Sequence, residues 1–97
     1  MDRRIYLTML YDYYGELFNE HKRLYFEDYY FHNLSLGEIS ENYNVSRNAV
    51  HKTIKSVEEK LNEYEKKLGL HQKSILFNEI IDEITDEDLK KRLQELL

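Results

Sequence analysis

Apolar residues recur along the chain at the three- and four-residue spacing of amphipathic helices. A first helix is predicted at about 3–18 and a second at about 20–31, after the capping residue Asn19. The apolar face of the first helix is expected to contain Ile5, Met9, Leu10, Tyr13, Tyr14 and Leu17. Proline is absent and there are only 3 glycines, so little interrupts this pattern. The chain is therefore predicted to be all-α, with five to six helices.

The segment at 35–57 has the signals of two helices joined by a tight turn. Ser35 and Glu38 are spaced as a capping box, in which each side chain accepts a hydrogen bond from the backbone of the other. Leu34 and Ile39 occupy the positions of a hydrophobic staple across the same helix start. This segment is predicted to be a helix-turn-helix.

The turn is predicted at Asn44, which tolerates a left-handed backbone, with Val45 reaching the core and Ser46 capping the next helix. That fourth helix is long, at about 47–68, and ends at Gly69. Its apolar seam consists of Val50, Ile54, Val57, Leu61, Tyr64 and Leu68. The first half of the seam is expected to pack within the motif. The second half needs another partner, either the C-terminal helices or a second copy of the chain.

Two shorter helices are predicted after the long one. The first lies at about 72–84, and the second is expected to be capped by Thr85, with Asp88 in its first turn. No linker or repeat divides the chain, so its 97 residues are expected to form a single helical domain.

The part of that domain at 58–97 is interpreted as an extension of the helix-turn-helix. It contains the second half of the long helix and both C-terminal helices. We expect it to form a homodimer interface between Leu61 and Leu97, because the apolar seam continues beyond the motif.

The net charge of −5 by itself opposes binding to nucleic acid, but its distribution along the chain favours binding at one segment. No acidic residue lies between Glu41 and Glu58, whereas Arg47, Lys52 and Lys55 all fall there. This positive stretch coincides with the start of the predicted recognition helix, which favours an anionic partner.

A helix with Val50 and Ile54 facing the core exposes a polar face on its other side. The predicted nucleic-acid-binding residues are Ser46, Arg47, Asn48, His51, Lys52 and Lys55. The helix start and Ser46 suit a phosphate, Arg47 and Asn48 suit base edges, and the lysines suit the DNA backbone. The partner is predicted to be DNA, with RNA as an alternative. The competing interpretation is a solvated polar face.

Other residue classes point to no chemistry. Cysteine is absent, the 4 histidines lie ten or more residues apart, and no nucleophile or phosphate-loop motif is present. We therefore expect no enzyme activity, metal or cofactor. The 9 tyrosines could stack single-stranded bases, but their helical spacing favours core positions. No apolar run is long enough to span a membrane, and a cytoplasmic protein is expected.

The helix-turn-helix resembles region 4 of bacterial sigma factors. The residues that carry this resemblance are Leu36, Glu38, Ile39, Val45, Ser46, Arg47, Val50 and Ile54. More of the chain, from about Leu10 to Ile84, resembles the YlxM family of small bacterial helix-turn-helix proteins. That resemblance includes Tyr29-Tyr30, Ser35-Leu36, Glu38-Ile39, Val45-Ser46-Arg47, Ala49-Val50, Ile54-Lys55, Tyr64-Glu65 and Lys67-Leu68.

The resemblance implies a sigma-region-4-like fold and a regulatory role linked to the signal recognition particle pathway. The competing function is a protein-interaction module, accessory to protein targeting, in which the acidic surface and the apolar seam engage a protein and no nucleic acid is bound. His51-Lys52 replaces an aromatic–acid pair of the family and makes this copy more basic. Asn44 replaces the usual turn glycine, and Thr53 replaces a sigma-factor arginine, which disfavours promoter recognition of that kind.

Overall fold

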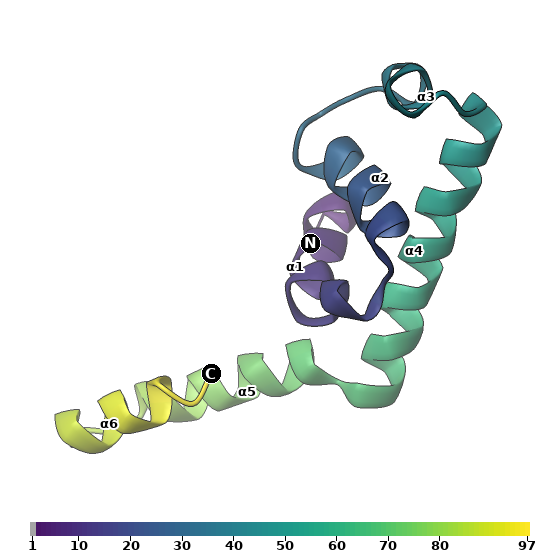
Figure 1. The fold of residues 1–97 in the computed structure, drawn as a ribbon. Helices are drawn as coiled ribbons and strands as arrows, with labels where there is room; N and C mark the ends of the chain where they lie inside the picture. The colour runs from purple at the N-terminus through teal and green to yellow at the C-terminus, as the bar shows by residue number, and fades with distance from the viewer. Residues whose placement is uncertain (1) are drawn as a thin grey trace.

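The computed structural model describes residues 2–97 and is helical throughout (Figure 1). Its α-helices are α1 (Arg3–Tyr14), α2 (Glu20–Tyr30), α3 (Leu36–Tyr43), α4 (Arg47–Leu68), α5 (Leu70–Asp82) and α6 (Glu87–Gln94). One 3-10 turn, η1 (Gly15–Leu17), follows α1, and the described residues contain no strand. These elements confirm the all-α helix-turn-helix fold and its long fourth helix.

The molecule is elongated because its last two helices extend beyond the packed part formed by the others. Helices α1, α2 and α3 lie along one side of α4, whereas α5 and α6 project away from them (Figure 1). The resulting extents are 55 × 24 × 24 Å. We call α5 and α6 together the tail.

The helix-turn-helix half of the core joins α2, α3 and the first turns of α4. Its buried residues are Tyr25, Ile39, Val50 and Ile54. Leu34 and Tyr43 pack against them from the edges. The predicted inward face of the recognition helix is therefore confirmed.

In the second half of the α4 seam, Leu61 and Tyr64 are covered by α1, and not by the C-terminal helices or a second copy as predicted. Leu68, the last residue of the predicted seam, is exposed. The cluster that joins α1, η1, α2 and α4 contains Leu7, Leu10, Tyr11, Tyr14, Phe18, Phe26, Val57 and Leu61. The chain turns at η1, between α1 and α2, so that both helices lie against α4. Burial of apolar surface in this cluster stabilises the arrangement.

The first helix differs from its prediction in face and length: α1 ends at Tyr14 and not near residue 18, and η1 follows it. Its buried face is formed by Leu7, Leu10, Tyr11 and Tyr14, at the i, i+3, i+4, i+7 spacing of one helical stripe. Ile5, Tyr13 and Leu17, expected in the core, are exposed. A strictly local pattern cannot choose between these overlapping stripes, and contact with both α2 and α4 selects the one that contains Tyr11.

Two helix starts in the tail also differ from prediction. Helix α5 begins at Leu70 and not near residue 72, because Gly69 adopts φ +63° and turns the chain directly from one helix into the next. Helix α6 is capped by Asp86 and not by Thr85. The Asp86 Oδ1 accepts a hydrogen bond from the Leu89 N–H at 3.1 Å.

No helix within residues 2–97 has the length and apolar content needed to cross a membrane.

Candidate nucleic-acid interface

The connection between α3 and α4 adopts the predicted helix-turn-helix geometry. Ser35 and Glu38 form the capping box at the start of α3, with both hydrogen bonds at 3.0 Å. Asn44 is left-handed, with φ 54° and ψ 47°. The Val45 N–H then donates to the Ser40 carbonyl at 3.0 Å. These local bonds set the direction in which α4 leaves the turn.

Val45 itself does not fill the core as predicted. Its side chain is 37% exposed. The backbone of Val45 closes the end of α3, which leaves its side chain at the surface of the turn.

Ser46 caps α4 by accepting a hydrogen bond from the Ala49 N–H at 3.0 Å. The N–H groups of Arg47 and Asn48 have no hydrogen-bond partner among residues 2–97. The first turn of α4 therefore presents two backbone donors and the positive end of the helix dipole to the outside.

The six predicted binding residues all lie on the surface of α4 and its cap, and we call them the recognition face. They are Ser46, Arg47, Asn48, His51, Lys52 and Lys55, and each is exposed. No carboxylate of the described residues forms an ion pair with the cations at 47, 52 and 55. The face can therefore offer its positive charge to an external anion.

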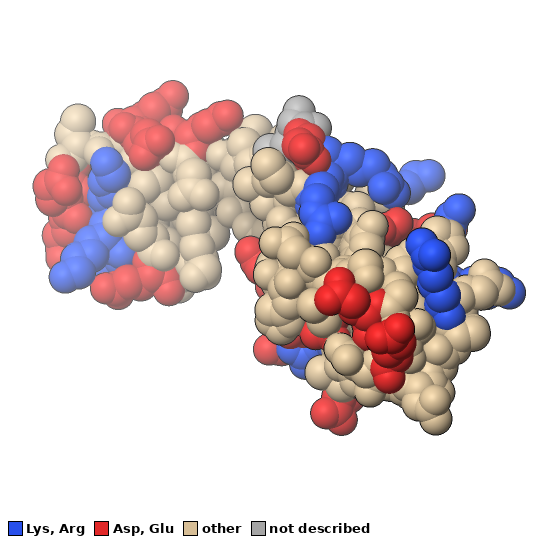
Figure 2. Space-filling view, turned by 90° about the horizontal axis from the view of Figure 1, so that it is seen from above, with Lys and Arg blue, Asp and Glu red and all other residues tan. Residues whose placement is uncertain are grey.

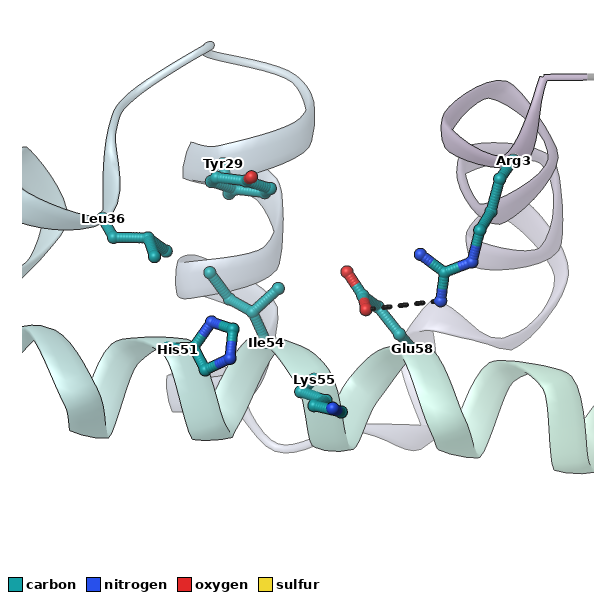
Figure 3. A pocket seen from close by; sticks show the side chains of 7 residues that line it. All are labelled: Arg3, Tyr29, Leu36, His51, Ile54, Lys55 and Glu58. Atoms are coloured by element: carbon teal, nitrogen blue, oxygen red, sulfur yellow. Dashed lines mark ion pairs between the residues drawn. The ribbon is translucent and has the colours of Figure 1, made fainter.

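A groove of about 220 Å³ lies beside the recognition face, where α4 meets the starts of α1 and α3 and the end of α2 (Figure 3). Its lining residues are Arg3, Tyr29, Leu36, His51, Ile54, Lys55 and Glu58. In Figure 3, Arg3 and Glu58 point toward one another from α1 and α4, and their ion pair measures 3.6 Å. Sequence reasoning missed Arg3, which is 52 residues from Lys55 in the chain.

The surface charge follows the same arrangement. Seen from above, Lys and Arg side chains gather at the upper right of the globular part, which is formed by α1 to α4 (Figure 2). Many acidic side chains of this view lie lower on the globular part or on the tail. The positive region is thus wider than the single helix that the sequence suggested.

Tyrosine hydroxyls fasten the helices that carry this interface. Tyr30 donates a hydrogen bond to Glu58 of α4, and Tyr43 of α3 donates to Asp28 of α2 at 2.9 Å. Burial, followed by the bond to Glu58, raises the pKa of Tyr30 well above its usual value. The hydroxyl therefore stays protonated and remains a donor at neutral pH.

The core interpretation of the tyrosines is confirmed for most of them. Tyr11, Tyr14 and Tyr25 are buried, and five others are half-buried. Burial and a 2.5 Å bond to Glu27 raise the pKa of Tyr11 to about 12. Rings packed between helices in this way are not available as a stacking platform for bases.

The histidines and acids form no metal-binding group of three or more within residues 2–97. His32 lies 3.0 Å from the Asp28 carboxylate, and His21 packs against the ring of Tyr25. Of the 4 histidines, only His51 belongs to the recognition face.

Comparison with known proteins shows that the whole chain matches a family of helix-turn-helix sequences. A family model described as "Putative helix-turn-helix protein, YlxM / p13 like" matches residues 1–97. A "UPF0122 protein" of Listeria welshimeri is 38% identical over 99 residues, covering 93% of this chain and 90% of the relative. One from a Geobacillus species is 40% identical over 91 residues, covering 94% and 83%.

A third relative matches more strongly over a shorter stretch. The "UPF0122 protein" of Desulforamulus reducens is 52% identical over 67 residues, which is 69% of this chain. That match covers only 57% of the relative's own length.

Proposed function

We propose that the chain, which belongs to the YlxM/p13-like family of helix-turn-helix proteins, is a cytoplasmic regulatory protein that binds duplex DNA through the recognition face. One observation carries this proposal. The cations at 47, 52 and 55 project from the start of α4 without an ion-pair partner among the described residues, in a chain whose net charge is −5.

The dimensions of the face suit a major groove. From Ser46 to Lys55 the helix rises about 14 Å at 1.5 Å per residue, against a groove about 12 Å wide. The first turn reaches the base edges through Arg47 and Asn48, while Lys52 and Lys55 meet the sugar-phosphate backbone. The two lysines of one chain that meet the backbone give a salt slope of about −1.8, and those of a dimer about −3.6.

Fluorescence anisotropy with a labelled duplex of mixed sequence tests this function. We expect wild-type protein to bind at about 50 mM salt and to weaken steeply toward about 200 mM. The double variant Arg47→Ala, Lys52→Ala should bind about 10–100-fold more weakly and with a shallower salt slope. Circular dichroism should show unchanged helicity, because both side chains are exposed.

Lys66→Ala with Lys73→Ala is the matched control, since it removes two exposed cations near the junction of α4 and α5, at the opposite end of α4 from the recognition face. It should leave most of the affinity in place. Absence of wild-type binding at about 50 mM salt would contradict the DNA proposal. An RNA duplex and a single strand of the same sequence, titrated in parallel, measure the preference for DNA.

We also propose that the protein is a homodimer and that the tail forms its interface. Leu61, the start of the interface predicted from sequence, is buried under α1 and takes no part in it. Ile81 is the buried apolar residue of the tail. The exposed ones are Leu70, Ile75, Leu76, Ile80, Leu89, Leu96 and Leu97. This number of exposed large apolar residues on two short helices favours association.

Sedimentation equilibrium at tens of micromolar tests the dimer. Wild type is expected at twice the chain mass of 11.9 kDa. Ile80→Glu should yield the monomer, because Ile80 is 61% exposed on the tail and a buried charge opposes association. Leu17→Glu is the control: Leu17 is 59% exposed on the globular part, and its replacement should leave the dimer intact. A monomeric wild type would overturn this proposal.

The same exposed tail supports the competing function, a protein-interaction module. Association with signal recognition particle components, which the family resemblance implies, stays a prediction of this kind. A pull-down against those components, with and without nuclease, separates the two functions. Retention that survives nuclease and the Arg47→Ala change supports the module, whereas loss of retention in both supports the DNA-binding protein.

A further inference from the structure

Arg3 stands at the edge of the groove beside α4, although it belongs to the first turn of α1 (Figure 3). We propose that Arg3 extends the recognition face, and that Arg3 and Lys55 together bind a backbone phosphate of the DNA duplex. This inference rests on the proposed function and adds to it a second element and a specific ligand group. Its basis is the convergence of side chains from α1 and α4 on one hollow.

The chemistry of the groove suits a phosphodiester. Arg3, His51 and Lys55 bring nitrogen donors to it from two helices. Its single carboxylate, Glu58, also accepts the hydrogen bond from Tyr30 and is only 15% exposed. A phosphate oxygen approaching from solvent therefore meets two cationic side chains before it meets the acid.

Arg3 has donors to spare for such a contact. Its side chain is 70% exposed, and the one ion pair it makes is 3.6 Å long. A guanidinium carries five N–H donors in a planar fork that matches the oxygens of a phosphate. The long pair with Glu58 leaves most of those donors free for a phosphate.

The neighbouring arginine has a different role. The Arg4 Nη2 donates to the Tyr29 carbonyl at 2.7 Å, and the guanidinium lies over the rings of Tyr29 and Tyr30, at 5.0 and 4.5 Å from their centres. Arg4 thereby fastens the start of α1 to the end of α2. This attachment places Arg3 at the groove and leaves it as the arginine of the pair that faces an external ligand.

The position of the groove along α4 agrees with a backbone contact. Lys55 lies about 14 Å along the helix axis from Ser46, close to the width of a major groove. When the first turn of α4 reaches the base edges, the segment at Lys55 arrives at the rim, where the phosphates are. Arg3 lies on the α1 side of that rim and adds a contact with the same strand.

Salt-dependent anisotropy with the labelled mixed-sequence duplex tests the proposal. Arg3→Ala should weaken binding about 3–10-fold at about 50 mM salt and reduce the salt slope by about 1, as expected for one lost phosphate contact. Arg3→Lys should keep most of the slope, because it keeps the charge. Glu58→Gln should tighten binding about 2–5-fold, since it removes the only acid of the groove and still accepts the Tyr30 hydrogen bond.

Arg23→Ala is the matched control. Arg23 is also an arginine paired with a glutamate, at 3.7 Å from Glu27, but it lies on α2 and outside this groove. It should leave the salt slope unchanged. An equal loss of slope in Arg3→Ala and Arg23→Ala would overturn the proposal, because the effect would then be one of total charge.

The outcomes separate this inference from the function on which it rests. Binding that is lost in the Arg47, Lys52 double variant but unchanged in Arg3→Ala overturns the phosphate contact alone. Absence of wild-type binding overturns both. A reduced slope in Arg3→Ala, an increase in affinity in Glu58→Gln and a silent Arg23→Ala support the contact.

Discussion

Replacing Phe26 by alanine should lower the free energy of unfolding by about 3–5 kcal/mol. The Phe26 side chain is fully buried, and its ring stacks on those of Tyr11 and Tyr30 with centre distances of 4.5 and 4.4 Å. It lies in the cluster where α1, α2 and α4 meet, so the alanine leaves a cavity that no single helix can close. Urea unfolding followed by circular dichroism measures the loss.

Phe31→Ala is the control for ring removal. Phe31 follows α2 and is 46% exposed, so its replacement should cost no more than about 1 kcal/mol. Equal losses in the two variants would mean that the packing of α1 and α2 against α4 is not the main source of stability. The same cluster supports the recognition face, because it anchors the second half of the helix that carries that face.

The second large effect is expected at Glu65, which joins α4, α1 and α5. Its carboxylate accepts hydrogen bonds from the Tyr14 hydroxyl at 2.7 Å and from the backbone N–H groups of His71 and Gln72 at 3.1 Å. Gly69, the residue before α5, has no side chain with which to cap that helix. Glu65 therefore acts as the cap of α5 from the preceding helix.

Glu65→Ala should release the tail while the rest of the fold persists. Hydrogen bonds to a charged group contribute about 1.5–3 kcal/mol, and partial exposure reduces this, so we expect a loss of about 2 kcal/mol in the docking of α5. Amide hydrogen exchange should quicken about 30-fold in α5. Amides of α4 around Ile54, which lies in the other core cluster, should keep their protection.

Glu63→Ala provides the matched comparison two residues earlier on the same helix. Glu63 pairs with Lys60 and Lys67 at the surface and bonds to no residue of α5. Its replacement should leave exchange in α5 unchanged. If Glu63→Ala and Glu65→Ala quicken exchange equally, the cap is not what holds the tail.

Acid should have the same effect as Glu65→Ala. Burial opposes the charged carboxylate, but the hydrogen bonds from Tyr14, His71 and Gln72 outweigh it and lower the pKa of Glu65. Because its pKa is lowered on folding, Glu65 stabilises the folded state at pH values above its unfolded-state pKa of about 4.3. This contribution disappears as the pH falls through the lower pKa of the folded state. Protection factors in α5, which are measured relative to the intrinsic exchange rate at each pH, should therefore fall at acid pH in wild type and change less in Glu65→Ala.

The orientation of the tail relative to α4, which the hydrogen bonds of Glu65 hold, matters for the proposed function. A dimer that joins through the tail places its two recognition faces at a distance that depends on this junction. Half-sites on DNA lie one helical turn, about 34–36 Å, or a multiple of it apart. A released tail should therefore weaken DNA binding by the dimer even though every cation of the recognition face is still present.

Helix starts were predictable wherever a cap lies within three residues of the groups it satisfies. Asn19, Ser35 and Ser46 cap α2, α3 and α4 as predicted. Asn44 adopts the left-handed turn that its side chain tolerates. The exceptions occur where adjacent residues compete, as Thr85 and Asp86 do at α6, or where the cap comes from another helix, as at α5.

The packing partner of α4 was not predictable from its seam. A stripe such as Val57 and Leu61 shows that a face is buried but not which element buries it. Ile5 and Tyr11 belong to overlapping stripes of one helix, and contacts with α2 and α4 bury only Tyr11. Long-range contacts of this kind depend on the whole arrangement and leave little trace in local periodicity.

The candidate site divides along the same line. The amino-acid order alone indicated the six residues of the recognition face, because helical periodicity and an acid-free stretch are properties of neighbouring residues. Arg3 lies far from that stretch in the chain, and only the packing of α1 on α4 brings it to the groove beside Lys55. Its one sequence signal is a pair of arginines near the start of an otherwise acidic segment. Caps and periodicity act within about one helical turn, whereas a surface shared by two helices exists only once both have folded.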